Sequence, residues 1–158
     1  MDDRVGGFDA RWFASAAGGE LVNGRDVVLC RVETDSRSVG PGALFVALKG
    51  ERVDGHDYAK AANLAGASAL LVSVGWWTGP GSSSGLSCPV IVVPDTLTAL
   101  QRAAKAWRQR FPSLLRFGVT GSSGKTSIKE MLAAILAQRR RTVRNPGNLN
   151  SEIGLPVS

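Results

Sequence analysis

The 158-residue sequence contains two cysteines and no long hydrophobic run. Cys30 and Cys88 each stand alone in an apolar segment, so the chain offers neither a disulfide framework nor a cysteine-based metal cluster, and we expect both to be buried. The longest apolar runs, such as residues 67–74, are far shorter than the about 20 residues of a membrane-spanning helix. No charged-then-apolar signal segment opens the chain. These absences predict a cytoplasmic protein with no membrane span.

Acidic residues are fewer than basic ones, 13 against 19, which gives a net charge of +6. Part of this excess lies in Arg139, Arg140, Arg141 and Arg144. A nucleic-acid patch is one interpretation. However, three of these arginines follow a predicted helix, where cations complement the helix dipole, and no aromatic residues alternate with them. We therefore expect no nucleic-acid partner, and we attribute the remaining excess to an anionic substrate.

Residues 120–127 carry the strongest chemical signal, Thr-Gly-Ser-Ser-Gly-Lys-Thr-Ser. A short apolar segment before them predicts a buried strand, formed by Leu114, Leu115, Phe117, Gly118 and Val119. Apolar residues after them recur at helical spacing: Ile128, Met131, Leu132, Ile135 and Leu136. Strand, glycine-rich loop and helix in this order are typical of a loop that binds nucleotide phosphates.

The residue types of this loop suit ATP or GTP. Glycines let the backbone approach an anion, the N–H groups of a helix start donate to it, Lys125 adds positive charge, and the Thr126 hydroxyl can bind Mg²⁺. The general P-loop pattern has a glycine where this chain has Val119, so the motif is a shorter variant. The alternative is a glycine-serine turn before an ordinary helix. The predicted nucleotide site consists of Gly121, Ser122, Ser123, Gly124, Lys125, Thr126 and Ser127.

The first ninety residues alternate between strand and helix patterns. A helix is expected after Asp9, as its N-cap, up to Gly18, and a second after Asp57, up to Gly66. Predicted strands cover residues 27–32, 43–48, 69–74 and 90–93, and a long helix covers residues 97–111. The predicted fold class is α/β, with a parallel or mixed sheet. We expect a small N-terminal α/β domain (residues 1–94), followed by the start of a P-loop-type parallel-sheet ATPase domain (residues 95–158).

Residues 75–87 are small and turn-forming, which predicts a surface loop. Trp76 and Trp77 in this loop either form a stacking platform or hold the loop on its own domain. Two residues remain after Pro156, whereas a nucleotide-binding sheet needs more strands and more acidic residues for Mg²⁺. We therefore expect the N-terminal portion of a longer enzyme, inactive by itself.

Four segments resemble the Mur ligases of peptidoglycan synthesis. They are residues 34–48 (Thr-Asp-Ser-Arg, then Pro-Gly-Ala-Leu-Phe-Val-Ala-Leu), 50–57 (Gly-Glu-Arg-Val-Asp-Gly-His-Asp), 120–130 and 147–156 (Gly-Asn-Leu-Asn-Ser-Glu-Ile-Gly-Leu-Pro). The first two are shared with the members that add the third peptide residue. The last two are similar to the members that add D-alanyl-D-alanine. Ala43 and Ser151 depart from the residues common there.

The resemblance implies ATP-driven amide formation. The terminal carboxylate of a UDP-N-acetylmuramoyl-tripeptide attacks the γ-phosphate of ATP and gives an acyl phosphate, from which the amine of D-alanyl-D-alanine displaces phosphate. It implies that Lys125 holds the β- and γ-phosphates and that Thr126 binds Mg²⁺, both as catalytic residues. Positioning and charge neutralisation dominate such a step. The alternatives are a family member that adds the third peptide residue and a nucleotide-switch protein with the same loop.

The resemblance also assigns the first domain to the UDP-sugar end of the substrate. Ser36 and Arg37 are the candidates there, since a hydroxyl and a guanidinium suit a diphosphate, and a turn closed by Asp35 is the alternative. His56 is a candidate substrate contact, although the segment 54–57 also fits a plain loop. Asn148 and Asn150 either line the junction near the phosphates or stabilise turns. We expect the full enzyme to be monomeric.

Overall fold

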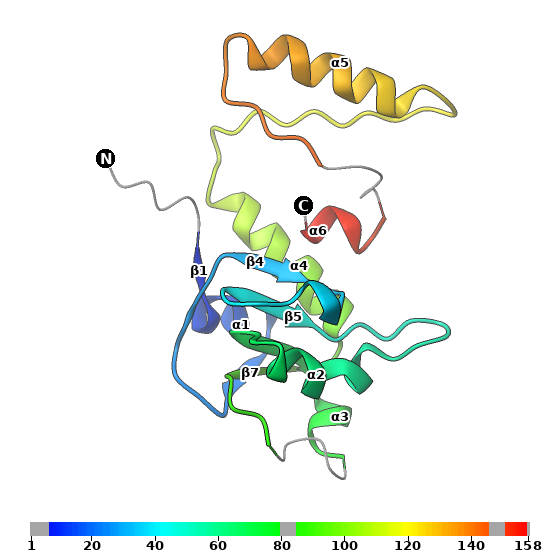
Figure 1. The fold of residues 1–158 in the computed structure, drawn as a ribbon. Helices are drawn as coiled ribbons and strands as arrows, with labels where there is room; N and C mark the ends of the chain where they lie inside the picture. The colour runs from blue at the N-terminus through cyan, green and yellow to red at the C-terminus, as the bar shows by residue number, and fades with distance from the viewer. Residues whose placement is uncertain (1–6, 80–84, 146–150, 158) are drawn as a thin grey trace.

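The computed structural model of the chain describes residues 7–79, 85–145 and 151–157 (Figure 1). Its helices are α1 (Ala10–Ala17), α2 (Ala59–Leu64), α3 (Val74–Trp77), α4 (Thr96–Gln109), α5 (Lys125–Ala137) and α6 (Gly154–Val157), with the 3-10 turns η1 (Ser36–Ser38) and η2 (Gly55–Tyr58). Its strands are β1 (Phe8–Asp9), β2 (Glu20–Val22), β3 (Val28–Leu29), β4 (Arg31–Glu33), β5 (Ala43–Val46), β6 (Ala69–Ser73) and β7 (Val90–Val93).

A five-stranded mixed sheet organises the first hundred residues. The strand order is β2-β7-β6-β5-β4, and β1 and β3 form a separate antiparallel pair. Strands β4 to β7 run parallel, whereas β2 pairs antiparallel with β7 at the edge. The α/β class and the mixed sheet predicted from the strand-helix alternation are confirmed.

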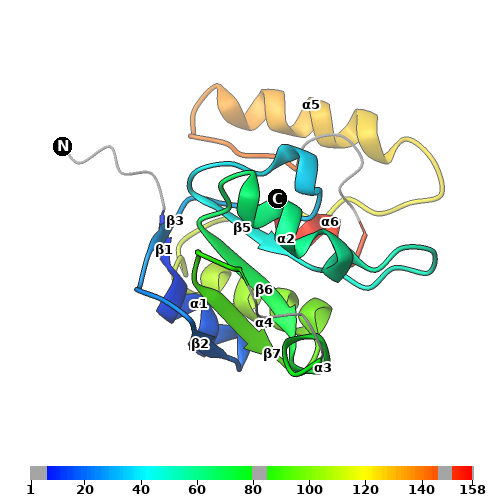
Figure 2. The same cartoon turned by 60° about the horizontal axis from the view of Figure 1, so that its bottom comes forward.

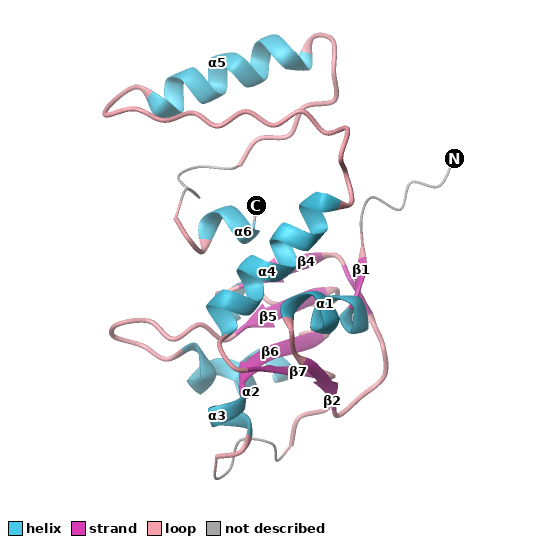
Figure 3. Cartoon of the chain, turned by 180° about the vertical axis from the view of Figure 1, so that it is seen from behind, coloured by secondary structure: helices cyan, strands magenta, loops and turns pink. Residues whose placement is uncertain are grey.

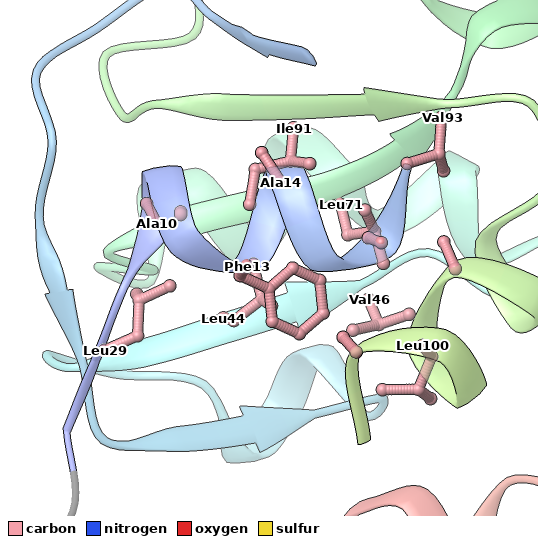
Figure 4. Packing of buried hydrophobic residues seen from close by; sticks show 14 residues of the cluster. Ala10, Phe13, Ala14, Leu29, Leu44, Val46, Leu71, Ile91, Val93 and Leu100 are labelled. Carbon is pink, nitrogen blue, oxygen red and sulfur yellow. The ribbon is translucent and has the colours of Figure 1, made fainter. Parts of the chain in front are cut away.

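Helices cover both faces of this sheet (Figures 2 and 3). On one face Leu44 and Val46 of β5 pack with α1 and α4. Figure 4 shows Phe13 of α1 among the side chains of β5 and β6. On the other face, Phe45 packs in a second cluster with α2 and with Trp76 and Trp77 of α3. The buried strands are apolar on both sides because a three-layer arrangement hides both sheet faces.

Helix boundaries follow the predicted caps with two exceptions. Asp9 occupies the N-cap position of α1, but its side chain makes no capping hydrogen bond. Asp57 was predicted to cap α2, but it lies inside η2 and does not cap this helix. Asp54 accepts the main-chain N–H of His56 and thereby caps η2, so the helical turn begins three residues earlier than the pattern indicates.

Three further predictions are wrong. Residues 114–119 form no strand, and within the described chain no other strand lies alongside to accept their hydrogen bonds. The segment predicted as a loop from residue 75 begins inside α3, which Ser73 caps through the N–H of Trp76. Cys30 is exposed, with its thiol directed at the carbonyl of Gly42, whereas Cys88 is buried as expected.

Helix α4 packs in the core on one face of the five-stranded sheet. Its N-cap Asp95 accepts the N–H of Thr98 at 2.7 Å, and Ala99, Leu100 and Ala103 are buried against the sheet. Helix α6 returns to the same region, where Gln101 donates to the carbonyl of Glu152. Ser151, at a position where the resemblance had a different residue, accepts the N–H of Gly154, the first residue of α6. No described helix has the length and hydropathy to cross a bilayer.

Candidate functional site

The glycine-rich loop ends where α5 begins. Gly124 is the N-cap, with φ of 74°, a left-handed conformation that side chains rarely adopt. Lys125 is the first helical residue. The predicted lysine therefore lies at a helix N-terminus, where the helix dipole attracts anions.

The main-chain N–H groups of this loop are available. Across the described residues, no hydrogen bond is donated by an N–H of residues 121–127, and the first one in α5 runs from Ile128 to Gly124. The ammonium of Lys125 instead donates to the loop carbonyls of Gly121, at 2.5 Å, and Ser122, at 3.4 Å. Unused donors around a half-buried lysine form a cradle that fits phosphate oxygens.

Charged side chains of α5 contact the segment that follows this helix. Glu130 pairs with Arg144, and Lys129 donates to the carbonyl of Asn145 at 3.0 Å. These contacts tie the segment after α5 back onto the helix. No group of three or more His, Cys, Asp or Glu side chains that suits a metal ion occurs among the described residues. Within the loop, Thr126 presents an exposed hydroxyl in the first turn of α5.

A second set of polar residues lies at the carboxyl edge of the sheet. Residues 35–37 follow β4, the hairpin from Lys49 to Asp54 follows β5, Ser73 ends β6, and Asp95 follows β7. Because β4 to β7 run parallel, all four connections emerge at the same edge. Ligands of open α/β sheets bind at this edge.

Arg37 and Asp35 form a forked ion pair in the turn after β4. Nε and Nη2 of Arg37 donate to the two carboxylate oxygens at 2.9 and 2.6 Å, and the carboxylate also accepts the N–H of Arg37. These hydrogen bonds lower the pKa of Asp35 to about 2 and raise the pKa of Arg37. The turn closed by Asp35 is thus present, and it still leaves Arg37 exposed at the surface.

His56 is buried, with 5% of its surface exposed, and both ring nitrogens are engaged. Nδ1 lies 2.5 Å from Oδ1 of Asp54, and Nε2 accepts the N–H of Ser73 at 2.9 Å. This arrangement assigns the proton to Nδ1 and makes the ring neutral. Burial acts to raise the pKa of Asp54, but the hydrogen bonds from His56 outweigh it and the pKa is lowered. His56 therefore joins the loop after β5 to the end of β6.

A cavity of about 420 Å³ opens beside His56. It is lined by Lys49, Asp54, His56, Ser73, Gly75, Trp76, Pro94, Asp95 and Thr96. Thr96 is buried and donates to the carbonyl of Ala47 at 2.8 Å, which fixes the floor where β5 and β7 end. The volume falls within the about 300–1,000 Å³ of ligand pockets.

The predicted site residues thus fall into separate places. Ser36, Arg37 and His56 lie at the carboxyl edge, on the connections after the neighbouring strands β4 and β5. Residues 121–127 lie at the start of α5, and Asn148 and Asn150 lie outside the described residues. Sequence reasoning missed Lys49, Asp95 and Thr96 as pocket residues. Their one signal is that each follows a predicted strand closely.

Comparisons with known families match both parts of the chain. Residues 30–108 match the model of the Mur ligase family, catalytic domain, and residues 119–158 match the Mur ligase middle domain. The chain belongs to the Mur ligase family. The predicted resemblance is therefore confirmed at the level of the family.

Curated Mur ligases similar to this chain include two bacterial UDP-N-acetylmuramoyl-tripeptide–D-alanyl-D-alanine ligases. The protein from Escherichia coli is 47% identical over 140 residues, which cover 89% of this chain. The protein from Treponema pallidum is 47% identical over 136 residues, which cover 80% of it. The chain spans 29% and 28% of the length of these two relatives.

Solved Mur ligase structures share the fold. The UDP-N-acetylmuramoylalanyl-D-glutamyl-2,6-diaminopimelate–D-alanyl-D-alanyl ligase from Acinetobacter baumannii aligns with 99% of this chain and 34% of its own, at a TM-score of 0.83 and 30% identity. The MurF ligase of Thermotoga maritima in complex with ADP aligns with 80% of this chain and 28% of its own, at a TM-score of 0.62 and 35% identity.

Proposed function

We propose that this chain carries the UDP-substrate unit and the ATP phosphate loop of an ATP-dependent ligase of peptidoglycan synthesis. The reaction joins the tripeptide carboxylate of a UDP-N-acetylmuramoyl-tripeptide to the amine of D-alanyl-D-alanine through an acyl phosphate. The names of the relatives support this substrate pair. The observation that carries the proposal is the cradle of unused N–H groups around Lys125 at the start of α5.

The nucleotide end of the proposal rests on residues 121–127. The N–H groups of Gly121, Ser122, Ser123 and Gly124 bind phosphate oxygens, together with those of the first helical turn up to Ser127. Lys125 exchanges its two loop carbonyls for the β- and γ-phosphates. The similar MurF ligase of Thermotoga maritima was solved in complex with ADP, which favours an adenine nucleotide.

The metal part of the proposal rests on Thr126. This residue is exposed in the first turn of α5, and its hydroxyl is the kind of oxygen ligand that Mg²⁺ accepts. Bound there, Mg²⁺ neutralises charge on the phosphates.

The substrate end of the proposal rests on the turn after β4. Nε and Nη2 of Arg37 donate to Asp35, while Nη1 has no partner within the described chain. We assign this nitrogen to the diphosphate of the UDP-sugar. Ser36, half-buried beside it, supplies a hydroxyl. His56 acts here by holding the loop, because both of its nitrogens are already used.

The division into two units stays a prediction. The sequence pattern placed it near residue 94, whereas the packing of α4 against α1 and the sheet favours a boundary after Gln109. The family matches likewise end at residue 108 and resume at residue 119. We propose that residues 110–120 connect the two units.

Replacing Lys125 with Met tests the nucleotide site. A hydrogen bond to a charged group contributes about 1.5–3 kcal/mol, so the dissociation constant for Mg-ATP rises roughly 10- to 100-fold. Titration of a fluorescent ATP analogue into the 158-residue chain measures it.

Lys105→Met is the matched control, since Lys105 is an exposed lysine of α4. It removes the same charge away from the loop and should leave binding intact. Equal weakening by both variants would mean that ATP responds only to net charge, and an absence of ATP binding by the wild-type chain would contradict the nucleotide site itself.

A further inference from the structure

Positive charge is concentrated in the part of the chain that follows Asp95. Residues 1–95 carry 8 basic and 11 acidic residues, whereas residues 96–158 carry 11 basic and 2 acidic ones. The 34 residues between Asp95 and Glu130 contain seven lysines and arginines and no acidic residue. Such a separation of charge along a chain is typical of proteins that bind an anionic macromolecule or an anionic surface.

Basic residues in the two parts of the chain have different partners. Arg11 pairs with Asp26 and Arg31 with Glu33, so an acidic residue offsets each of these arginines. Five exposed basic residues on α4 and after it form no ion pair with any residue that the structure describes: Arg102, Lys105, Arg108, Arg110 and Arg116. We call these five residues the α4 basic face.

Helical spacing directs most of this face outward. Arg102, Lys105 and Arg108 recur every three residues along α4, on the side opposite to the residues that α4 buries in the core. Gln101 donates to the carbonyl of Glu152, which places one acidic residue near this side. Helix α4 ends on the left of Figure 1 and α5 begins on the right, so the end of the face lies apart from the phosphate loop.

The end of α4 holds the other two residues of the face. Nη2 of Arg116 donates to the carbonyl of Arg108 at 2.8 Å, which brings Arg116 back to the helix. The guanidinium of Arg110 lies over the rings of Trp12 and Trp107, 5.4 and 4.9 Å from their centres. The fold thus holds both charges in place beside an aromatic cluster.

The rings of this cluster pack against one another. Trp107 contacts Phe8, Trp12 and Phe111 edge to face, with ring centres 5.8, 5.5 and 5.5 Å away. Proteins that bind single-stranded nucleic acid stack bases on open ring faces, which this packing disfavours. The indole N–H groups of the half-buried Trp12 and Trp107 donate to no acceptor among the described residues. Such tryptophans suit a lipid interface, where headgroups accept their hydrogen bonds.

We propose that the α4 basic face docks this protein on a bilayer that contains anionic phospholipids. The inference goes beyond the proposed function and does not depend on it. Each lysine or arginine near such a surface strengthens attachment about fivefold, so several together attach a protein that has no described membrane-spanning helix. Headgroup phosphates accept hydrogen bonds from the arginines. The attachment is reversible, because salt screens charges that stay in water.

Co-sedimentation with lipid vesicles tests this inference on the 158-residue chain. We expect the chain to sediment with vesicles of phosphatidylcholine and phosphatidylglycerol, to stay in solution with phosphatidylcholine alone, and to be released by salt. Lys105→Gln with Arg108→Gln removes two charges from the face, so the partition coefficient should fall roughly 25-fold. Arg139→Gln with Arg140→Gln removes two exposed charges after α5 and is the matched control, which should retain most of the binding.

Two results would overturn the inference. One is wild-type sedimentation that phosphatidylglycerol does not increase, and if the chain then binds a fluorescent DNA duplex, the face belongs to nucleic acid. The other is equal weakening by the two double variants, which would show a response to net charge alone. Circular dichroism verifies folding, and should the first double variant not fold, Lys105→Gln alone replaces it with an expected loss of about fivefold. ATP binding is measured separately, so failure of the vesicle test leaves the proposed function untouched.

Discussion

Asp35 and Arg37 lie two residues apart, and the structure makes them a single unit. The carboxylate caps η1 through the N–H of Arg37 and clamps the guanidinium in a fork. The sequence left open whether this segment is a turn or a diphosphate site. The geometry shows that the turn holds Arg37 in place, so the two interpretations are compatible.

Titration of Asp35 provides a prediction at this scale. Its folded-state pKa of about 2 lies below the ordinary 3.8, so the ion pair stabilises the fold above that ordinary value and loses this effect as pH falls toward 2. Replacing Arg37 with Gln should raise the pKa of Asp35 part of the way to its ordinary value, because the main-chain N–H at position 37 still donates to the carboxylate. Carboxyl NMR measures the midpoint, and Arg108→Gln on α4 is the control. A midpoint unaltered by Arg37→Gln would refute the fork.

His56 shows what a residue pattern misses. The segment 54–57 suggested a helix cap at Asp57 and a substrate contact at His56, but the structure assigns the cap to Asp54. Nε2 of His56 accepts the N–H of Ser73, which lies seventeen residues away at the end of β6. No local pattern indicates such a partner, because it depends on β5 and β6 lying side by side.

At the scale of elements, burial explains which predictions hold. The runs of β5, β6 and β7 are apolar on both sides and lie between two helix layers, so their patterns predicted strands close to the observed ones. Residues 114–119 have a similar apolar pattern but no neighbouring strand within the described residues. Hydrophobic pattern alone does not make a strand, because its hydrogen bonds come from a partner.

The N-cap of α4 gives a prediction for one element. Asp95→Ala removes the acceptor for the N–H of Thr98 and should lower the free energy of unfolding by about 1 kcal/mol. Asp95→Asn retains an acceptor and should cost much less. Urea unfolding followed by circular dichroism compares the two, and equal losses would show that the charge, rather than the cap, stabilises α4.

At the scale of the whole molecule, α5 differs in burial from α4, which is the described helix of similar length. None of the residues of α5 is buried, and Met131 is 65% exposed, whereas α4 buries Ala99, Leu100 and Ala103 in the core. Phe117, just before the phosphate loop, is 59% exposed. The apolar face of α5 therefore contributes little to holding this helix in place.

Hydrogen exchange should reflect that difference. Helices α4 and α5 have similar lengths, 14 and 13 residues, so their internal hydrogen bonds are matched while their packing is not. Opening α5 exposes little additional apolar surface, so its amides should exchange orders of magnitude faster than those of α4. Mass spectrometry of peptides from both helices measures the rates. Equal protection would show that α5 is packed in solution.

The phosphate loop before α5, the strands β5, β6 and β7 and the helices α1, α2 and α4 follow from residue types and their periodicity, whereas β1, β2 and α3 were not predicted. The predicted features depend on neighbours along the chain. The cavity formed by Lys49, Trp76 and Asp95 is different, because it joins residues that follow three separate strands. Strand order and direction bring these residues to one edge of the sheet, and that order arises from long-range packing on which periodicity carries no information.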